Sequence, residues 1–190
     1  MDFAVLKERL KLPDGAESYW HRHINKLADG TEEEGGWVQN TASVARTVFV
    51  NKCAIVGANA RVEDHARIDD FAIVAGHAII TDRVCIAGKA IVTDNVRVSG
   101  HAKITHNSVV EHSAEIRDSA TISGNARISG APRIGGKVLI TSNAQISGNP
   151  QLSGSVVIAG SAIITGSAVF RGGFRVDGGT WDSGTHTGQK

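Results

Sequence analysis

A branched or bulky apolar residue occupies every sixth position of the chain from Val38 to Val176. Two residues before most of these positions lies a small residue, usually Ala, as in the pair Ala126 and Ile128. The residue between the two varies in character. The three residues that follow are rich in Gly, Asn, Asp and Ser. A period this regular indicates a repeat architecture.

Each repeat predicts a short β-strand followed by a turn. Residues two apart on a strand point to the same side, so the small and the branched residue both face inward. Gly, Asn, Asp and Ser supply turns and tolerate positive φ. A period of six does not fit the period of about 3.6 residues of an α-helix. Twenty-four such positions at three per coil predict an all-β, parallel β-helix of about eight triangular coils.

The hexad Ala126-Arg127-Ile128-Ser129-Gly130-Ala131 resembles the hexapeptide repeat of the left-handed parallel β-helix superfamily. The left-handed coiling, an exception to the usual right-handed crossover, is implied by this resemblance. The coil is entered through Gly35-Gly36-Trp37-Val38, which is similar to the start of the coil in a group of mostly uncharacterised bacterial and phage hexapeptide proteins. Some of that group carry a transferase label by analogy.

The pattern divides the chain into three parts. Residues 1–35 lie outside the hexads and are expected to form a capping or recruitment segment, with a short helix between Val5 and Leu12 and a strand from Tyr19 to Leu27. Residues 36–178 form the β-helix, and residues 179–190 form a C-terminal tail or cap. Aromatic residues near the end of the coil predict a plug that closes the core: Phe170, Phe174 and Trp181.

Composition and charge limit the partners of the chain. The net charge of +1 gives no basis for binding nucleic acid or an anionic membrane. Cys53 and Cys85 fall two coils apart, on a corner and on a face, so a disulfide is not expected. The residues from Met1 to Glu8 are too few and too charged for a signal peptide, and no transmembrane run exists. The sequence therefore predicts a cytoplasmic protein without a nucleic-acid or membrane partner.

Residues eighteen apart stack in adjacent coils, so each face of the prism carries one column of outward residues. Two columns are mixed in character, but the third begins with four aliphatic residues in successive coils, Ile55, Ile73, Ile91 and Val109, and carries Ile163 farther along. A contiguous exposed apolar stripe marks a contact surface. The N-terminal segment could fold back over it, but a subunit interface is favoured, and the resemblance implies a homotrimer of parallel prisms.

Two corners border the apolar face and would meet across a groove between subunits. Their titratable residues are His77, Asp94 and His112 on one corner and Asp70, Lys89 and His106 on the other. Convergent titratable groups in such a groove predict a ligand site, with the two aspartates and the lysine as binding residues and the three histidines as candidate catalytic bases. The alternative interpretation is that all six are ordinary polar turn residues.

The spacing of His65, His101 and His106 is comparable with that of the zinc-binding histidines of hexapeptide carbonic anhydrases. The repeat argues against such a site, because Arg83 lies between the first two and His106 falls on another corner. The neighbouring Gln-Asp and Arg-Gly-Asp signatures of that family are also missing from this sequence. No metal ion is therefore expected.

Two further columns of corner residues receive structural interpretations. Stacked asparagines predict a ladder that satisfies turn backbone: Asn107, Asn125 and Asn143. Three aspartates on the corner opposite the apolar face are interpreted as a solvated, self-compensating charged edge: Asp64, Asp82 and Asp118.

The absence of any insertion in the repeat bears on function. Hexapeptide acyltransferases, the enzyme class that the resemblance brings to mind first, use a histidine base and usually a loop that is extruded from a coil and closes the acyl-CoA groove. The twenty-four hexads leave no room for such a loop. The sequence therefore predicts a non-catalytic, oligomeric scaffold or ligand-binding protein that needs no cofactor. The alternative is an acyl-CoA-dependent acyltransferase.

Overall fold

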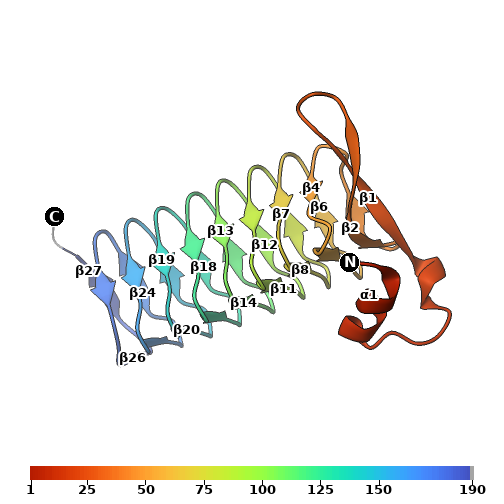
Figure 1. Cartoon of the computed structure of the whole chain (residues 1–190). Coiled ribbons are helices and arrows are strands. Elements are labelled where there is room, and N and C mark those ends of the chain that lie inside the picture. Colours follow the sequence, from red (N-terminus) through yellow and green to blue (C-terminus); the bar gives the residue numbers. More distant parts are fainter. Residues whose placement is uncertain (189–190) are drawn as a thin grey trace.

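The computed structural model describes residues 1–188 of the chain. Most of the molecule is a parallel β-solenoid of about eight turns, a long three-sided prism with one short helix beside its N-terminal end (Figure 1). This confirms the all-β fold and the coils predicted from the period of six. Within the described residues, no helix is both long enough and apolar enough to cross a membrane.

Each side of the prism is one sheet, built mostly from two-residue strands, to which every third strand of the coil contributes. Sheet A contains β1 (Trp20–Lys26), β2 (Glu32–Gln39), β5 (Ile55–Val56), β8 (Ile73–Val74), β11 (Ile91–Val92), β14 (Val109–Val110), β17 (Arg127–Ile128), β20 (Gln145–Ile146), β23 (Ile163–Ile164) and β26 (Thr180–Trp181). Sheet B contains β3 (Ser43–Val44), β6 (Arg61–Val62), β9 (Ile79–Ile80), β12 (Arg97–Val98), β15 (Glu115–Ile116), β18 (Arg133–Ile134), β21 (Gln151–Leu152), β24 (Val169–Arg171) and β27 (Thr185–Thr187). Sheet C contains β4 (Phe49–Val50), β7 (Arg67–Ile68), β10 (Cys85–Ile86), β13 (Lys103–Ile104), β16 (Thr121–Ile122), β19 (Leu139–Ile140), β22 (Val157–Ile158) and β25 (Arg175–Val176).

The strands stack in a constant register. Paired residues are eighteen apart from the first pair, Trp37 with Ile55, to the pair of Val157 with Arg175. The branched residues point into the prism, and all of them are buried except Val44 in the first coil, which is partly exposed. The core is therefore one continuous column of Val, Ile and Ala along the axis of the prism.

Three-residue corners join the sheets, and we name them A/B, B/C and C/A after the sheets that they connect. The middle residue of most corners has a positive φ, as in Asp82 (60°) and Gly76 (68°). A side chain at Gly76 would place its Cβ 2.3 Å from the backbone nitrogen of Asp94 in the next coil. The close approach requires glycine at this position, and the positive φ explains why Gly, Asp and other turn residues recur at the middle of the corners.

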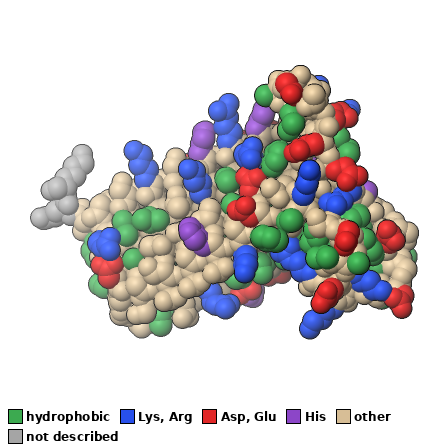
Figure 2. Space-filling model, viewed as in Figure 1, with side chains coloured by type: hydrophobic (Ala, Val, Ile, Leu, Met, Phe, Trp, Pro, Cys, Tyr) green, Lys and Arg blue, Asp and Glu red, His purple; other side chains and the backbone are tan. Residues whose placement is uncertain are grey.

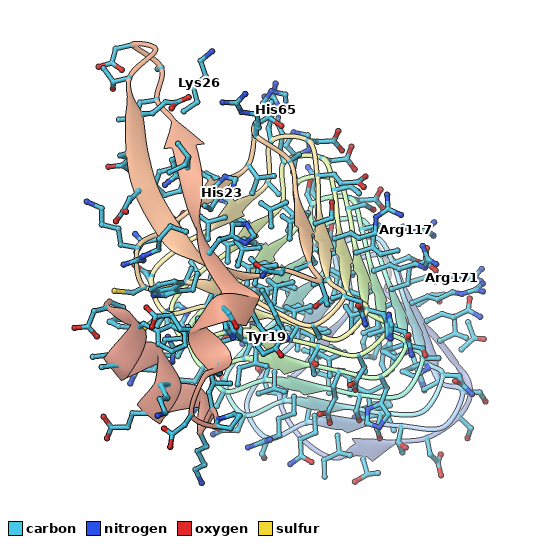
Figure 3. All side chains as sticks on the ribbon, turned by 90° about the vertical axis from the view of Figure 1, so that its right-hand side faces the viewer. Tyr19, His23, Lys26, His65, Arg117 and Arg171 are labelled. Carbon is cyan, nitrogen blue, oxygen red and sulfur yellow. The ribbon has the colours of Figure 1, made fainter. Side chains whose placement is uncertain are left out.

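The N-terminal segment forms a helix and a hairpin, close to the predicted elements. Helix α1 (Phe3–Leu10) begins at Asp2, whose carboxylate accepts the N–H of Val5 at 2.9 Å, and it ends at Lys11 in the left-handed conformation. A 3₁₀ turn, η1 (Ala16–Tyr19), leads into β1, which pairs with β2 in antiparallel fashion. The segment lies over the first coils and covers one end of the prism (Figure 3).

The hairpin satisfies the open edge of sheet C with side chains. The buried side chain of Asn25 accepts the N–H of Val50 at 2.8 Å and donates to its carbonyl oxygen at 3.0 Å. His23 lies between the hairpin and the first coil, with its Nε2 atom 2.9 Å from the carbonyl oxygen of Val48 (Figure 3). The two side chains thus occupy the place that another strand would take.

The C-terminal end is closed by an aromatic cluster, as predicted. The ring of Phe170, which is fully buried, lies 5.4 Å from that of Phe174 and 5.8 Å from that of Trp181. His186 stacks on Phe170 at 4.7 Å and completes the cluster. The coil runs beyond the expected boundary at residue 178, because β26 and β27 still pair with sheets A and B. Residues 189 and 190 of the expected tail lie outside the described residues.

Candidate functional site

The N-terminal segment covers the beginning of the apolar face, which lies on sheet A. Ile55 is only 1% exposed and packs with Leu6 of α1 and with Trp37. The placement of Ile55 at a subunit interface is therefore wrong, because the chain itself buries this side chain. The alternative in which the N-terminal segment folds back is confirmed for this part of the face.

The apolar stripe continues beyond the N-terminal segment. Ile73 is half-buried at the edge of the N-terminal cluster, and Ile91 and Val109 follow it in register on the next two coils. Arg127 then ends the contiguous run. Ile163 lies apart from it, three coils beyond Val109, and is 36% exposed. The outward apolar surface that is left is therefore short.

The A/B corner brings together two of the predicted site residues and one that sequence reasoning missed. One ligand atom each of Asp94, Glu111 and His112 lies within 4.8 Å of the others. The carboxylate of Asp94 already accepts the backbone N–H of His112 at 2.9 Å, and Glu111 lies 3.8 Å from the His112 ring. Carboxylates gather at exposed corners without a metal ion, so the closeness of three possible ligand atoms does not by itself make a metal site.

The C/A corner carries the other three predicted residues in consecutive coils. Asp70 accepts the backbone N–H of Gly88 at 3.0 Å, and the N–H of Lys89 donates to the carbonyl oxygen of His106 at 2.7 Å. The ring of His106 lies 3.0 Å from the hydroxyl of Thr105. These residues are part of the turn structure, and the width of sheet A separates them from His77, Asp94 and His112 within one chain.

The corner aspartates have a structural role that the sequence did not reveal. Asp64, Asp82 and Asp118 each sit at the middle of a B/C corner and accept the backbone N–H of the same position one coil later, at 2.7–2.9 Å. Asp70 and Asp94 do the same on the other two corners. The interpretation of the first three as only a solvated charged edge is therefore incomplete. The predicted stacking of the asparagines is confirmed, with amide contacts of 3.1 and 3.0 Å, but among the described residues these side chains bond to one another and not to turn backbone as expected.

Histidine and basic side chains project along the upper edge of the prism in Figure 2. His65, Arg83 and His101 stack at the B/C corner and line a hollow of about 370 Å³. His106 belongs to the C/A corner, so the structure keeps it apart from the other two histidines, as the repeat predicts.

Burial shifts the pKa of several titratable groups, among them His23 and Cys85. Burial lowers the pKa of His23, and the nearby His21 lowers it further, whereas the bond to Val48 opposes this shift. Burial, with a contribution from Asp69, raises the pKa of the Cys85 thiol. Cys85 and Cys53 are both free thiols. The candidate bases His77, His106 and His112 are all exposed.

A further hollow lies on sheet B and was missed by sequence reasoning. It measures about 500 Å³ and is lined by Asn95, Arg97, Ser113, Glu115, Ala131, Arg133, Asn149 and Gln151. The sequence did contain a signal, because outward residues of β12, β15, β18 and β21 fall in one column beside small corner residues. That column looked like an ordinary mixed, solvated face.

Comparison with known proteins adds no family to this description. No protein-family model matches the chain, and no curated protein matches it significantly in sequence.

Proposed function

We propose that this chain is a non-catalytic scaffold, a left-handed β-helix of the hexapeptide-repeat type that associates with copies of itself and offers its remaining faces to ligands. The observation that carries the proposal is the constant eighteen-residue register between β2 and β25. A coil without an inserted loop gives a stiff rod on which side chains repeat at a fixed spacing of about 4.8 Å. A preorganised active site, in contrast, is normally assembled from loops carried by a rigid scaffold.

The uncovered part of the apolar stripe supports self-association. Ile91 and Val109 continue the N-terminal apolar cluster outward along sheet A, and Phe71, which is 49% exposed, lies at the C/A corner one coil before Ile91. A second copy that places the same stripe against this one would bury all three side chains. By resemblance to other hexapeptide proteins, the proposed assembly is a homotrimer of parallel prisms. The free thiols of Cys53 and Cys85 fit the reducing cytoplasm, which we propose as its location.

The mass of the protein in solution, measured by light scattering during size-exclusion chromatography, tests this proposal. The unaltered chain should have three times the chain mass of 19.9 kDa. The double variant Ile91→Asp/Val109→Asp should be monomeric, because it places two charges in the interface. Val157→Asp, at the equivalent outward position on sheet C, is the matched control and should leave the mass unchanged. A monomeric unaltered chain, or an unchanged mass in the double variant, would refute the self-association.

An acyl-CoA-dependent acyltransferase is the second candidate function. It is favoured by the contact of His112 with Glu111, since a carboxylate beside an imidazole is an arrangement used in general-base catalysis. Acetyl-CoA should not raise the melting temperature of a scaffold, and a scaffold should transfer no acetyl group to amine or hydroxyl acceptors. Stabilisation and transfer that are both lost in His112→Ala would overturn the non-catalytic proposal.

A further inference from the structure

The groove on sheet B has a regular, ladder-like construction. Its floor consists of the outward residues Arg97, Glu115, Arg133 and Gln151, which stack in register on β12, β15, β18 and β21. Its wall consists of the last residues of four A/B corners, among which Ala131 is the smallest. The groove spans four coils, about 14 Å at a strand spacing of about 4.8 Å. An extended ligand that runs along the prism axis would fit this shape.

The amide side chains of the groove form no hydrogen bonds within the described part of the fold. At other corners, asparagines bond to one another and aspartates bond to backbone N–H groups of the next coil. The side chains of Asn95, Asn149 and Gln151 make no hydrogen bond to any other residue in the range 1–188. These amides therefore present donors and acceptors to whatever enters the groove.

The groove carries an excess of positive charge. Two of the lining residues, Arg97 and Arg133, are basic, and one, Glu115, is acidic. Glu115 lies 3.7 Å from Arg133 and 4.0 Å from Arg117, which is outside the lining, so Arg117 shares in balancing its charge. Arg97 stacks next to Glu115 on the other side and has no carboxylate within 4.0 Å among the described residues. Arg97 and Arg133 are two coils apart, about 9.6 Å at the strand spacing. Two guanidinium groups at such a distance can each bind a separate anionic group of one ligand.

We infer that this groove binds an acidic oligosaccharide, with carboxylates on Arg97 and Arg133 and sugar hydroxyls on the amides of Asn95, Asn149 and Gln151. Carboxylates match the planar, forked guanidinium groups, and hydroxyls match side-chain amides, which both donate and accept. None of the eight lining residues is aromatic, which disfavours a single-stranded nucleic acid, because its bases need stacking partners. The groove lies on a different face from the proposed self-association surface, so either proposal can fail without the other.

Isothermal titration calorimetry of the full chain at low salt tests the inference. The probes are hexagalacturonate, which carries a carboxylate on each sugar, the neutral cellohexaose of equal length, and a short oligothymidylate. Hexagalacturonate should bind, its affinity should fall as salt is added, and cellohexaose should bind at least tenfold more weakly. The variant Arg97→Gln/Arg133→Gln should lose about tenfold or more in affinity for hexagalacturonate.

Two further variants make the result specific to the groove. Ala131→Glu leaves both arginines in place but adds a negative charge to the wall, and it should also weaken hexagalacturonate binding. Arg61→Gln removes an arginine from the same face outside the groove, where it pairs with Glu63, and should leave the affinity unchanged. Equal losses in Arg61→Gln, tighter binding of oligothymidylate, or no binding of hexagalacturonate would each overturn the inference. Circular dichroism establishes that every variant is folded.

Discussion

The side chain of Asn25 holds both backbone polar groups of Val50, accepting from its N–H and donating to its carbonyl oxygen. Val50 belongs to the outermost strand of sheet C, and its N–H and C=O point away from the coil that follows. A single amide thus takes the place of a missing strand. Because parallel strand edges can pair with other chains, this cap also protects the sheet from unwanted pairing.

Replacing Asn25 by Ala should destabilise the N-terminal coil. Two buried backbone groups would lose their partners, at a cost of about 1–3 kcal/mol each. The loss should appear as a lower midpoint in urea and as faster amide exchange at Val50. Asn40→Ala, which removes an exposed asparagine that also bonds the chain near η1, is the control and should cost much less. Equal costs in the two variants would contradict the capping role.

The stability of the N-terminal cap should depend on pH through His23. Burial lowers the pKa of His23 in the folded protein, so the unfolded chain takes up a proton first as the pH falls. The stabilising contribution is therefore complete above the unfolded pKa of about 6.5 and is lost as the pH falls from there towards the folded pKa.

Urea unfolding at pH 8 and pH 5.5 measures this effect. The unaltered protein should be less stable at the lower pH, and His23→Gln, which keeps an N–H donor near Val48 but does not titrate, should show a smaller difference between the two. His21→Gln removes an exposed histidine on the same strand, and it should reduce the difference only slightly, because burial and not His21 is the main cause of the lowered pKa of His23. A pH difference that persists unchanged in His23→Gln would assign it to other groups.

The left-handed corners predict a substitution that stabilises the protein. Ala58 has a φ of 51°, which costs an L-residue about 1–2 kcal/mol. Ala58→Gly removes this cost, while the bonds of its backbone to Gln39 and Thr41 remain. We expect a gain of about 1 kcal/mol in unfolding free energy.

Ala60→Gly, two residues later, should lower the unfolding free energy instead of raising it. Ala60 is fully buried, so the change removes an apolar methyl group from the core, worth about 0.8 kcal/mol, and adds backbone freedom to the unfolded chain. Thermal denaturation of the two variants distinguishes them. Destabilisation by both would show that the conformation of Ala58 carries no strain.

The aromatic plug should stabilise only the last coils of the prism. Phe170→Ala removes a fully buried ring that touches Phe174, Trp181 and His186, a loss of about 3–5 kcal/mol. In a solenoid each coil contacts only its neighbours, so amide exchange should accelerate in β23–β27 and stay unchanged in β7. Phe71→Ala, at an exposed corner, should leave exchange in the last coils unaltered. Uniform acceleration along the whole prism would show that the coils unfold as one unit.

Sequence reasoning succeeded where the six-residue period applies. The period places every inward residue from Val38 to Val176 and stacks the outward columns eighteen apart, as the strand pairs show. Sequence reasoning did not predict the contacts of the segment that lies outside the six-residue period. The contacts of Asn25 and His23 with β4 arise from a hairpin outside the repeat, and nothing in its spacing indicates which edge it will cover.

The candidate site was harder to predict for a different reason. The period fixes which corner residues stack, but it does not say whether a stacked side chain bonds to the fold or remains free. The side chain of Asp94 proved to bond to the next coil, whereas the side chain of Asn95, its neighbour, forms no hydrogen bond to any other described residue and lines the groove on sheet B. Whether a corner side chain bonds to the next coil depends on its length and direction, which its position in the repeat does not determine.

The constant register has a consequence for the length of the molecule. Its interval falls to seventeen residues between Ile163 and Thr180 and to sixteen between Val169 and Thr185, only where the aromatic plug closes the core. Between the two closed ends, any coil presents the same edge to its neighbours as the coil before it. Gain or loss of one eighteen-residue coil would therefore change the distance between the ends by about 4.8 Å and leave both caps intact. The length of the solenoid can therefore change in equal steps of one coil.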